Sequence, residues 1–239
     1  MNWTRVKNTA LAPMVLLALV ATQVEAQNLS TAETPVRIID FEAGDNEALF
    51  TYTDASAWKF SNVGNSTVLE LSGTSSYEPR VRSPLNIAML NGVKYASFVL
   101  EADLRQTGKE YGHRDMCLFF GIKDASNFYY VHLASQADAN AHNIFLVNDE
   151  PRRPIATRTT QGIRWGDGWN KIRLVRDVVT GSIQIYFNDM ETPIMEAVDM
   201  HFDGGYLGFG SFDDTGMIDN IRIYGTPLSE QTAFFGQNK

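Results

Sequence analysis

Three of the four histidines in this chain, His113, His132 and His142, fall within a span of 30 residues. Histidine is the side chain best suited to moving protons near neutral pH. Tyr130 lies two residues before His132, so on a strand the two side chains share one face. These four residues form the predicted catalytic group.

Residues suited to binding surround this group. They are Arg80, Arg82, Tyr111, Arg114 and Asn143. In one interpretation, a His or Tyr removes the proton next to a uronate carboxyl group, an Arg or Asn neutralises the carboxylate, and Tyr acts as the acid. This chemistry is β-elimination, the reaction of a polysaccharide lyase.

Two other functions are open for the same residues. The histidines could hold a metal ion together with Asp115, although their spacing is irregular. They could also only bind, with aromatic rings stacking on sugar faces and polar groups contacting hydroxyls. Each histidine alone could simply satisfy a hydrogen bond at a strand edge.

Strand signals recur along the chain, and no helical periodicity of useful length interrupts them. The predicted strands cover residues 37–42, 67–71, 95–105, 115–122, 127–134, 143–147, 170–176, 182–187, 206–212 and 217–224. This spacing predicts an all-β protein, a two-sheet antiparallel jelly-roll β-sandwich. Counting back from the turn at 123–126 places Asp115, Cys117 and Phe119 opposite Ala134, His132 and Tyr130. Such a register depends on the turn, because a slip of one residue reverses the face.

The ends of the chain suggest processing and tails. Residues 1–26 have the basic start, apolar stretch and small residues at the cleavage position that are typical of a secretory signal peptide. We expect a secreted or periplasmic protein with a tail at 27–35, one sandwich domain at 36–225 and a C-terminal tail at 226–239. A monomer is expected.

The charge balance limits the partners. The formal net charge is −8, which argues against nucleic acid or an anionic membrane as a partner. Between residues 77 and 176, however, Lys and Arg outnumber Asp and Glu by 14 to 10. An anionic ligand could therefore be held by that stretch. The single cysteine, Cys117, excludes an internal disulfide and lies in an apolar run.

The closing segments carry a resemblance to a known group. They are GWNKIRLVR at 168–176, GSIQIYFN at 181–188, GYLGFG at 205–210 and IDNIRIY at 218–224. In this order they resemble the concanavalin A-like lectin/glucanase superfamily, in particular secreted family-16-like domains and the 3-keto-disaccharide hydrolase (DUF1080) group. The resemblance implies a concave sheet that faces a glycan. It also implies a structural calcium ion near the termini, for which Asp40, Glu42 and Asp219 match, and no other cofactor.

Catalytic motifs of related groups are incomplete here. The family-16 pattern E-x-D-x-E has its nearest match at Glu101-Ala102-Asp103, but Arg105 stands in place of the last acid. We therefore interpret Glu101 and Asp103 as a solvated strand face rather than a catalytic pair. The segment from Arg80 to Arg82 is similar to the Arg-rich strand of alginate-lyase jelly rolls, whose other motifs are absent.

The other conspicuous acidic, basic and tryptophan residues are expected in turns, loops or the core. Asp213 and Asp214 are expected to form a hairpin turn. Arg152 is expected in a solvated loop, with the alternative that it touches an acidic glycan. Trp169 is expected in the core, and Trp165 in a loop. The sequence thus predicts a protein that binds a poly- or oligosaccharide on a concave sheet and leaves open whether it cleaves that sugar, with two alternatives: a non-catalytic lectin-like module and a hydrolase of a modified disaccharide.

Overall fold

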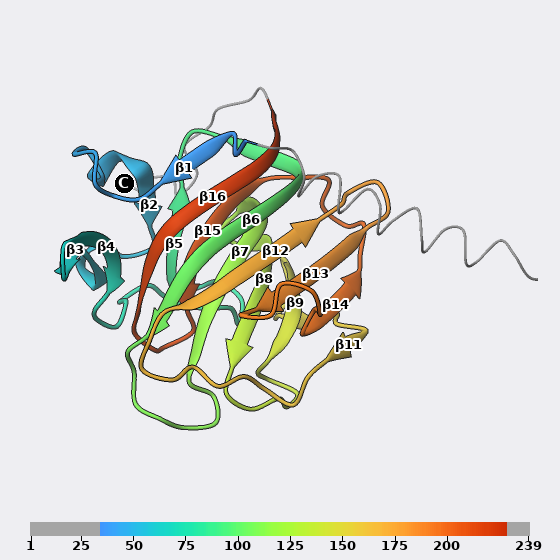
Figure 1. Cartoon of the computed structure of the whole chain (residues 1–239). Helices are drawn as coiled ribbons and strands as arrows, with labels where there is room; N and C mark the ends of the chain where they lie inside the picture. Colours follow the sequence, from blue (N-terminus) through green and yellow to red (C-terminus); the bar gives the residue numbers. More distant parts are fainter. Residues whose placement is uncertain (1–33, 229–239) are drawn as a thin grey trace, which may run out of the picture.

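Two antiparallel sheets pack face to face and form a β-sandwich (Figure 1). The computed structural model describes residues 34–228, and the predicted signal peptide and most of both tails lie outside these residues. Helical structure in this range is limited to two 3-10 turns at Glu47–Leu49 and Ala55–Ala57. In the described part of the chain, no helix is long and apolar enough to cross a membrane.

The nine-stranded sheet, called the front sheet here, lies nearest the viewer in Figure 1. Its spatial order is β11 (Arg158–Thr159), β14 (Met195–Val198), β13 (Ser182–Phe187), β12 (Asn170–Arg176), β6 (Lys94–Gln106), β16 (Gly216–Leu228), β4 (Ser66–Leu71) and β3 (Trp58–Val63). The ninth strand, β1 (Arg37–Ile39), also pairs with β16.

The seven-stranded sheet, called the back sheet, lies behind it. Its spatial order is β10 (Arg153–Pro154), β9 (Asn143–Asn148), β8 (Asn127–Ala134), β7 (Asp115–Asp124), β15 (Tyr206–Ser211), β5 (Asn86–Leu90) and β2 (Phe50–Tyr52). The predicted all-β sandwich is therefore confirmed, as is the antiparallel pairing within each sheet.

Side-chain alternation explains why one face of the front sheet is exposed to solvent. In β6, Leu100, Ala102 and Leu104 are buried in the core, whereas Glu101 and Asp103 between them are only half-buried. Such alternation is typical of a sheet that faces a core on one side and water on the other. Glu101 and Asp103 thus lie on the outer face of the front sheet, as the sequence predicted.

The back sheet is apolar on both faces. Its inner face joins the main core, and its outer face carries a second buried cluster. That cluster consists of Ile87, Met89, Cys117, Phe119, Ile122, Phe128, Tyr130, Phe145, Val147 and Tyr206, with Val81 packed against it. The part of this face around Phe119 and Phe145 is therefore closed to solvent.

The structure agrees with some of the local predictions and corrects others. The register that places Asp115, Cys117 and Phe119 opposite Ala134, His132 and Tyr130 is confirmed. The strand β16 continues to Leu228, past the expected start of the tail at residue 226, because Pro227 and Leu228 find partners at the beginning of β6. Trp169 is 38% exposed, so its expected place in the core is wrong.

Candidate active site

Charged and polar side chains converge where β7 begins and β8 and β15 end. Asp115 is the first residue of β7, Cys117 lies two residues later on the same face, and His132 is the cross-strand partner of Cys117. All three are buried. Because β15 pairs with β7, the loop after β15 brings Asp213 and Asp214 to the same place. We call these five residues the histidine–carboxylate cluster.

Asp115 is the centre of this cluster. One of its carboxylate oxygens accepts a hydrogen bond from Ser211 Oγ at 2.7 Å. The other oxygen, Oδ2, accepts from the backbone N–H of Phe212 at 3.1 Å and from Cys117 Sγ at 3.1 Å. Burial alone would raise the pKa of Asp115, but the charge of His132 and these hydrogen bonds together hold it below its usual value.

His132 is fixed by a carbonyl group on one side and a carboxylate on the other. Its Nδ1 lies 3.1 Å from the carbonyl oxygen of Asn140, which can only accept a hydrogen bond. Its Nε2 lies 3.2 Å from Asp115 Oδ2, within ion-pair distance. The angle of that approach does not satisfy hydrogen-bond geometry, so Nε2 is a buried polar atom without a hydrogen-bond partner.

Arg152 covers the cluster from the loop between β9 and β10. It donates to the Tyr130 hydroxyl at 2.7 Å and to the Asn140 carbonyl at 2.8 Å. Its guanidinium lies over the rings of Phe145 and Phe212, 4.8 and 4.5 Å from their centroids. Arg152 is only half-buried, so the cation remains within reach of a ligand.

The two aspartates of the loop after β15 have raised pKa values. Burial raises the pKa of Asp214 to about 6, although its carboxylate accepts hydrogen bonds from the Tyr111 hydroxyl and the backbone of Asp115. Burial and the charge of Asp115 also raise the pKa of Asp213. Shifted pKa values gathered at one place are characteristic of functional sites, although structural ion pairs also produce them.

Tyr130 and His132 lie next to each other as the sequence predicted, and Asn143 is the cross-strand partner of His132. The Asn143 side chain accepts a hydrogen bond from the backbone of Ala156. Tyr130 is fully buried, and burial raises its pKa above the usual range despite the nearby charge of Arg152. Tyr111 reaches the cluster through Asp214.

The other predicted site residues make separate contacts. His113 is exposed and lies 2.6 Å from Asp138. His142 is fully buried, with Nδ1 accepting from the backbone of Ala134 and Nε2 2.9 Å from Thr160 Oγ1. The three histidines therefore do not present their rings on one open surface.

The predicted arginines are also spread out. Arg114 is buried and bonds Gln106 of β6, which ties the two sheets together. Arg80 is exposed and pairs with Asp149. Arg82 is exposed, and its backbone carbonyl accepts from the backbone of Arg152.

Three side chains of the candidate site come from loops and were not among the predicted site residues. Asp213 and Asp214 were interpreted as a turn, and Arg152 as part of a solvated loop. Their signal was visible: two adjacent acids directly follow a buried, glycine-rich strand, and an arginine pair stands between two prolines. Only the pairing of β15 with β7 shows that these acids meet Asp115.

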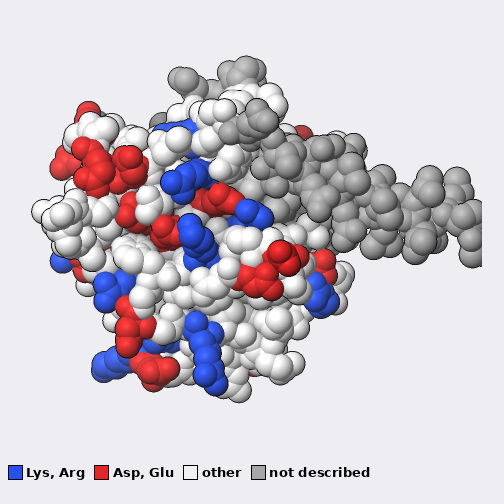
Figure 2. All heavy atoms as spheres, in the orientation of Figure 1, with Lys and Arg blue, Asp and Glu red and all other residues white. Residues whose placement is uncertain are grey.

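A second polar region lies on the outer face of the front sheet. It is a hollow of about 230 Å³ over β6, β12 and β16. Positive and negative side chains alternate over this face in Figure 2. We call this region the front hollow; its polar lining residues are Glu101, Asp103, Lys171, Arg173, Asn220 and Arg222.

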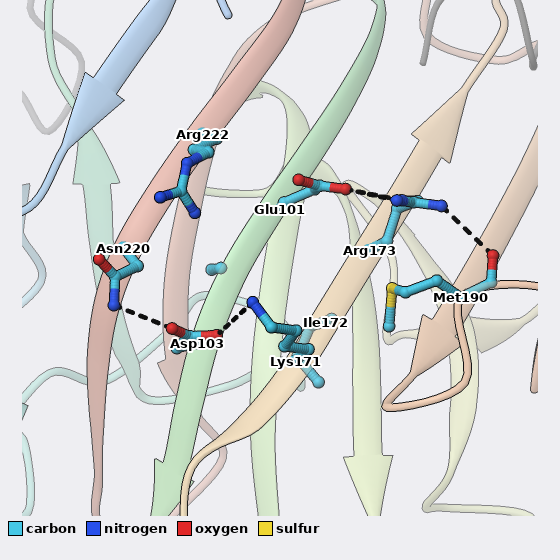
Figure 3. A pocket seen from close by; sticks show the side chains of 9 residues that line it. Glu101, Asp103, Lys171, Ile172, Arg173, Met190, Asn220 and Arg222 are labelled. Carbon is cyan, nitrogen blue, oxygen red and sulfur yellow. Dashed lines mark hydrogen bonds and ion pairs between the residues drawn. The ribbon is translucent and has the colours of Figure 1, made fainter. Parts of the chain in front are cut away.

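Most charges of the front hollow are paired, as Figure 3 shows. Arg173 donates to Glu101 at 2.6 Å. Asp103 accepts from Asn220 at 2.9 Å and lies 3.7 Å from the Lys171 ammonium. Among residues 34–228, no side chain forms a hydrogen bond or ion pair with the guanidinium of Arg222. Within residues 34–228, Arg222 is therefore the one cation of the hollow without a hydrogen-bond or ion-pair partner.

Two of the three residues expected to hold calcium lie close to each other. Glu42 and Asp219 both accept from the Ser66 hydroxyl, at 3.0 and 3.1 Å. Burial raises the pKa of Asp219, and the charge of Glu42 adds to this effect. Asp40 accepts from the backbone of Glu42. Two carboxylates and a hydroxyl are ligand types that calcium prefers, so this part of the set fits the ion.

Comparisons with known proteins define the fold. No protein-family model matches the chain, and no curated protein matches it. A galectin-like protein of unknown function from Bacillus subtilis superposes with a TM-score of 0.57 at 11% identity, covering 82% of this chain and 98% of that one. A carbohydrate-binding module, CBM66, from Bacillus subtilis gives 0.53 at 16% identity, covering 74% and 96%.

A plant lectin extends this similarity. The metal-free lectin I-B4 of Griffonia simplicifolia has a TM-score of 0.51 and 12% identity, covering 81% of this chain and all of that one. At such identities the similarity shows the fold alone. The chain has the two-sheet β-sandwich fold of these proteins.

Proposed function

We propose that this protein binds a poly- or oligosaccharide at the rim of the histidine–carboxylate cluster. The rim consists of the exposed or half-buried side chains around that cluster, namely Tyr111, His113, Arg152, Phe212 and Asp213. The observation that carries the proposal is the position of Arg152, a half-buried cation stacked on Phe212 and Phe145 at the mouth of a buried acid–base cluster.

The chemistry of the rim suits a sugar. Carbohydrate sites combine an aromatic or apolar surface with a few fixed polar groups that contact hydroxyls. Here Phe212 supplies the apolar surface, while Arg152 and Asp213 supply a donor and an acceptor. The similarity in fold to a protein named a carbohydrate-binding module and to a lectin supports the same class of ligand.

Binding to immobilised neutral and acidic polysaccharides tests this proposal. Arg152→Gln removes the cation, and we expect affinity to fall on the order of tenfold, which corresponds to about 1.4 kcal/mol. Arg153→Gln is the matched control, because Arg153 is the exposed neighbour on β10. Equal affinities for the two variants would contradict binding at the rim.

The front hollow provides the competing location. Arg222→Gln removes its unpaired cation without touching the rim. If this variant loses binding while Arg152→Gln retains it, the sugar binds the front sheet and the rim proposal fails. Loss confined to acidic glycans would in addition identify the Arg222 guanidinium as the partner of a carboxylate or sulfate.

Cleavage of the bound glycan is a second candidate. The observation that favours it is the pairing of His132 with Asp115 beneath Arg152, since an oriented histidine is the usual general base. In a lyase reaction the base would take the proton beside the uronate carboxyl group, the bond to the leaving oxygen would break, and an acid would protonate that oxygen. Tyr130, whose hydroxyl accepts from Arg152 beside His132, is the remaining candidate for the acid, whereas His113 and His142 make their contacts elsewhere.

Mass spectrometry of products distinguishes the reactions. Unsaturated fragments indicate a lyase, and fragments that gain a water indicate a hydrolase, including one that acts on a modified disaccharide. His132→Ala should abolish turnover while affinity is largely retained, and His201→Ala, an exposed histidine in another loop, is the control. If a broad panel yields no fragments from a protein that binds it, the protein is a non-catalytic module.

A further inference from the structure

The buried face of the back sheet brings three different metal-ligating side chains together. Oxygen, sulfur and nitrogen atoms of Asp115, Cys117 and His132 all lie within 4.8 Å of one another, and all three residues are buried. Cys117 Sγ and His132 Nε2 are 3.1 and 3.2 Å from the same oxygen, Asp115 Oδ2. Ligands of one tetrahedral zinc ion lie roughly 3.3–3.8 Å apart, given bonds of about 2.0–2.3 Å.

The orientation of His132 leaves Nε2 facing a carboxylate oxygen. Because its Nδ1 faces the Asn140 carbonyl, Nδ1 carries a proton, and a neutral imidazole then has its lone pair on Nε2. That lone pair would face a carboxylate oxygen at 3.2 Å without a hydrogen bond. The contact is favourable only if a second proton or a metal ion lies on Nε2.

We propose that Asp115 Oδ2, Cys117 Sγ and His132 Nε2 form a buried binding site for a divalent metal ion of the zinc class. Thiolate and imidazole ligands suit zinc, and the two anionic ligands neutralise its charge inside the protein. Binding replaces the thiol proton of Cys117 and any proton on Nε2, and both leave to solvent.

The surroundings of the three ligands match the second shell of a metal site. A ligating histidine usually donates its other N–H to a carbonyl or carboxylate group, as His132 does to Asn140. Ser211 Oγ and the backbone N–H of Phe212 orient the Asp115 carboxylate. Asp213 is exposed, and its carboxylate lies within 4.8 Å of that of Asp115, so it marks the side from which an ion would reach the three ligands.

Cobalt substitution provides a test that is independent of any activity on sugars. The full chain, produced without a polyhistidine tag, is titrated with Co²⁺ and its near-ultraviolet absorption is recorded. We expect one equivalent to bind with a sulfur-to-cobalt charge-transfer band. Since Cys117 is the only cysteine in the chain, this band identifies its ligand directly.

Variants complete the design. Cys117→Ser should lose the band, His132→Gln should weaken binding at least tenfold, and His201→Ala should behave as the unmodified chain. A chain that takes up no Co²⁺ or Zn²⁺, or that binds them without the band, would overturn the proposal. If Cys117→Ser does not fold, the spectrum of the unmodified chain still decides the question. Glycan binding is measured separately, so either proposal can fail alone.

Discussion

At the scale of single residues, burial controls the protonation of the candidate active site. The Cys117 thiol has a pKa well above its usual value because it is buried and lies beside Asp115. It is therefore a protonated donor to that carboxylate unless a metal ion takes the place of the proton. The same low-dielectric setting makes the Asp115 charge dependent on its partners. A substitution at Cys117 should therefore change the protonation of Asp115, and a substitution at Asp115 should change that of Cys117.

His142 should make the fold sensitive to acid. Burial and the nearby charge of His132 lower its pKa from 6.5 to about 4. Between pH 6.5 and pH 4, the folded state therefore binds fewer protons than the unfolded chain. The stability that is present above pH 6.5 is lost as the pH falls toward 4. The loss is on the order of 3 kcal/mol.

Urea unfolding at pH 7 and pH 5 checks this prediction. The midpoint of the unmodified chain should fall between the two conditions by clearly more than that of His142→Gln. The exposed His201 again serves as control, and His201→Ala should keep the full pH dependence. Parallel pH profiles for the unmodified chain and His142→Gln would show that another group is responsible.

At the scale of elements, close packing of β15 holds the cluster together. β15 lies between β5 and β7, and Gly210 pairs with Ile87 on one side and with Cys117 on the other. A Cβ atom added at Gly210 would lie 1.8 Å from the carbonyl oxygen of Asn86. The backbones of β15 and β5 must therefore approach more closely than any side chain allows.

Gly210→Ala should consequently destabilise the protein by at least about 1–3 kcal/mol, the usual cost of overpacking. Gly168→Ala is the matched control, since a Cβ atom there meets nothing within 4 Å. Urea midpoints of the two variants provide the measurement. A midpoint for Gly210→Ala equal to that of Gly168→Ala would mean that β15 can move away from β5 at little cost.

A second place where elements meet lies between the turn that follows β1 and the two strands β4 and β16. We propose that calcium binds between Glu42, Asp219 and Ser66, so Ca²⁺ should raise the melting temperature and a chelator should lower it. Asp219→Asn should largely remove the response, while Asp45→Asn, at an exposed acid in the same turn region, should retain it. Identical melting curves with calcium and with chelator would rule out the site.

At the scale of the whole molecule, the sandwich carries a closed face and an open one. The outer face of the back sheet has its own buried apolar cluster, whereas the outer face of the front sheet is charged and hollowed. The candidate active site lies at one end of the closed face, where loops replace the apolar side chains. Ligands would thus approach the ends of the inner strands β7, β8 and β15 rather than the middle of the back sheet.

Export is the prediction that concerns the whole chain. If residues 1–26 are a signal peptide, the exported protein should begin at Gln27. Intact-mass measurement of protein recovered outside the cytoplasm checks this start. A recovered chain that still carries residues 1–26 would contradict processing at Ala26.

The sequence by itself determined ten of the sixteen described strands and the local register of β7 and β8. Alternation in β6 and the short turn at 123–126 are local signals, so they predicted which residues share a face, including Tyr130 and His132. Strands without alternation, such as β5, were missed, because a strand buried on both faces shows no period.

Only the tertiary structure decided what the polar residues do. Asp213 meets Asp115 across 98 positions of sequence because β15 pairs with β7, and no local pattern encodes that pairing. In the same way, His113 and His142 are close in sequence to His132, but their rings make separate contacts with Asp138 and Thr160. Chain proximity constrains the backbone, whereas the assembly of a site depends on which strands become neighbours.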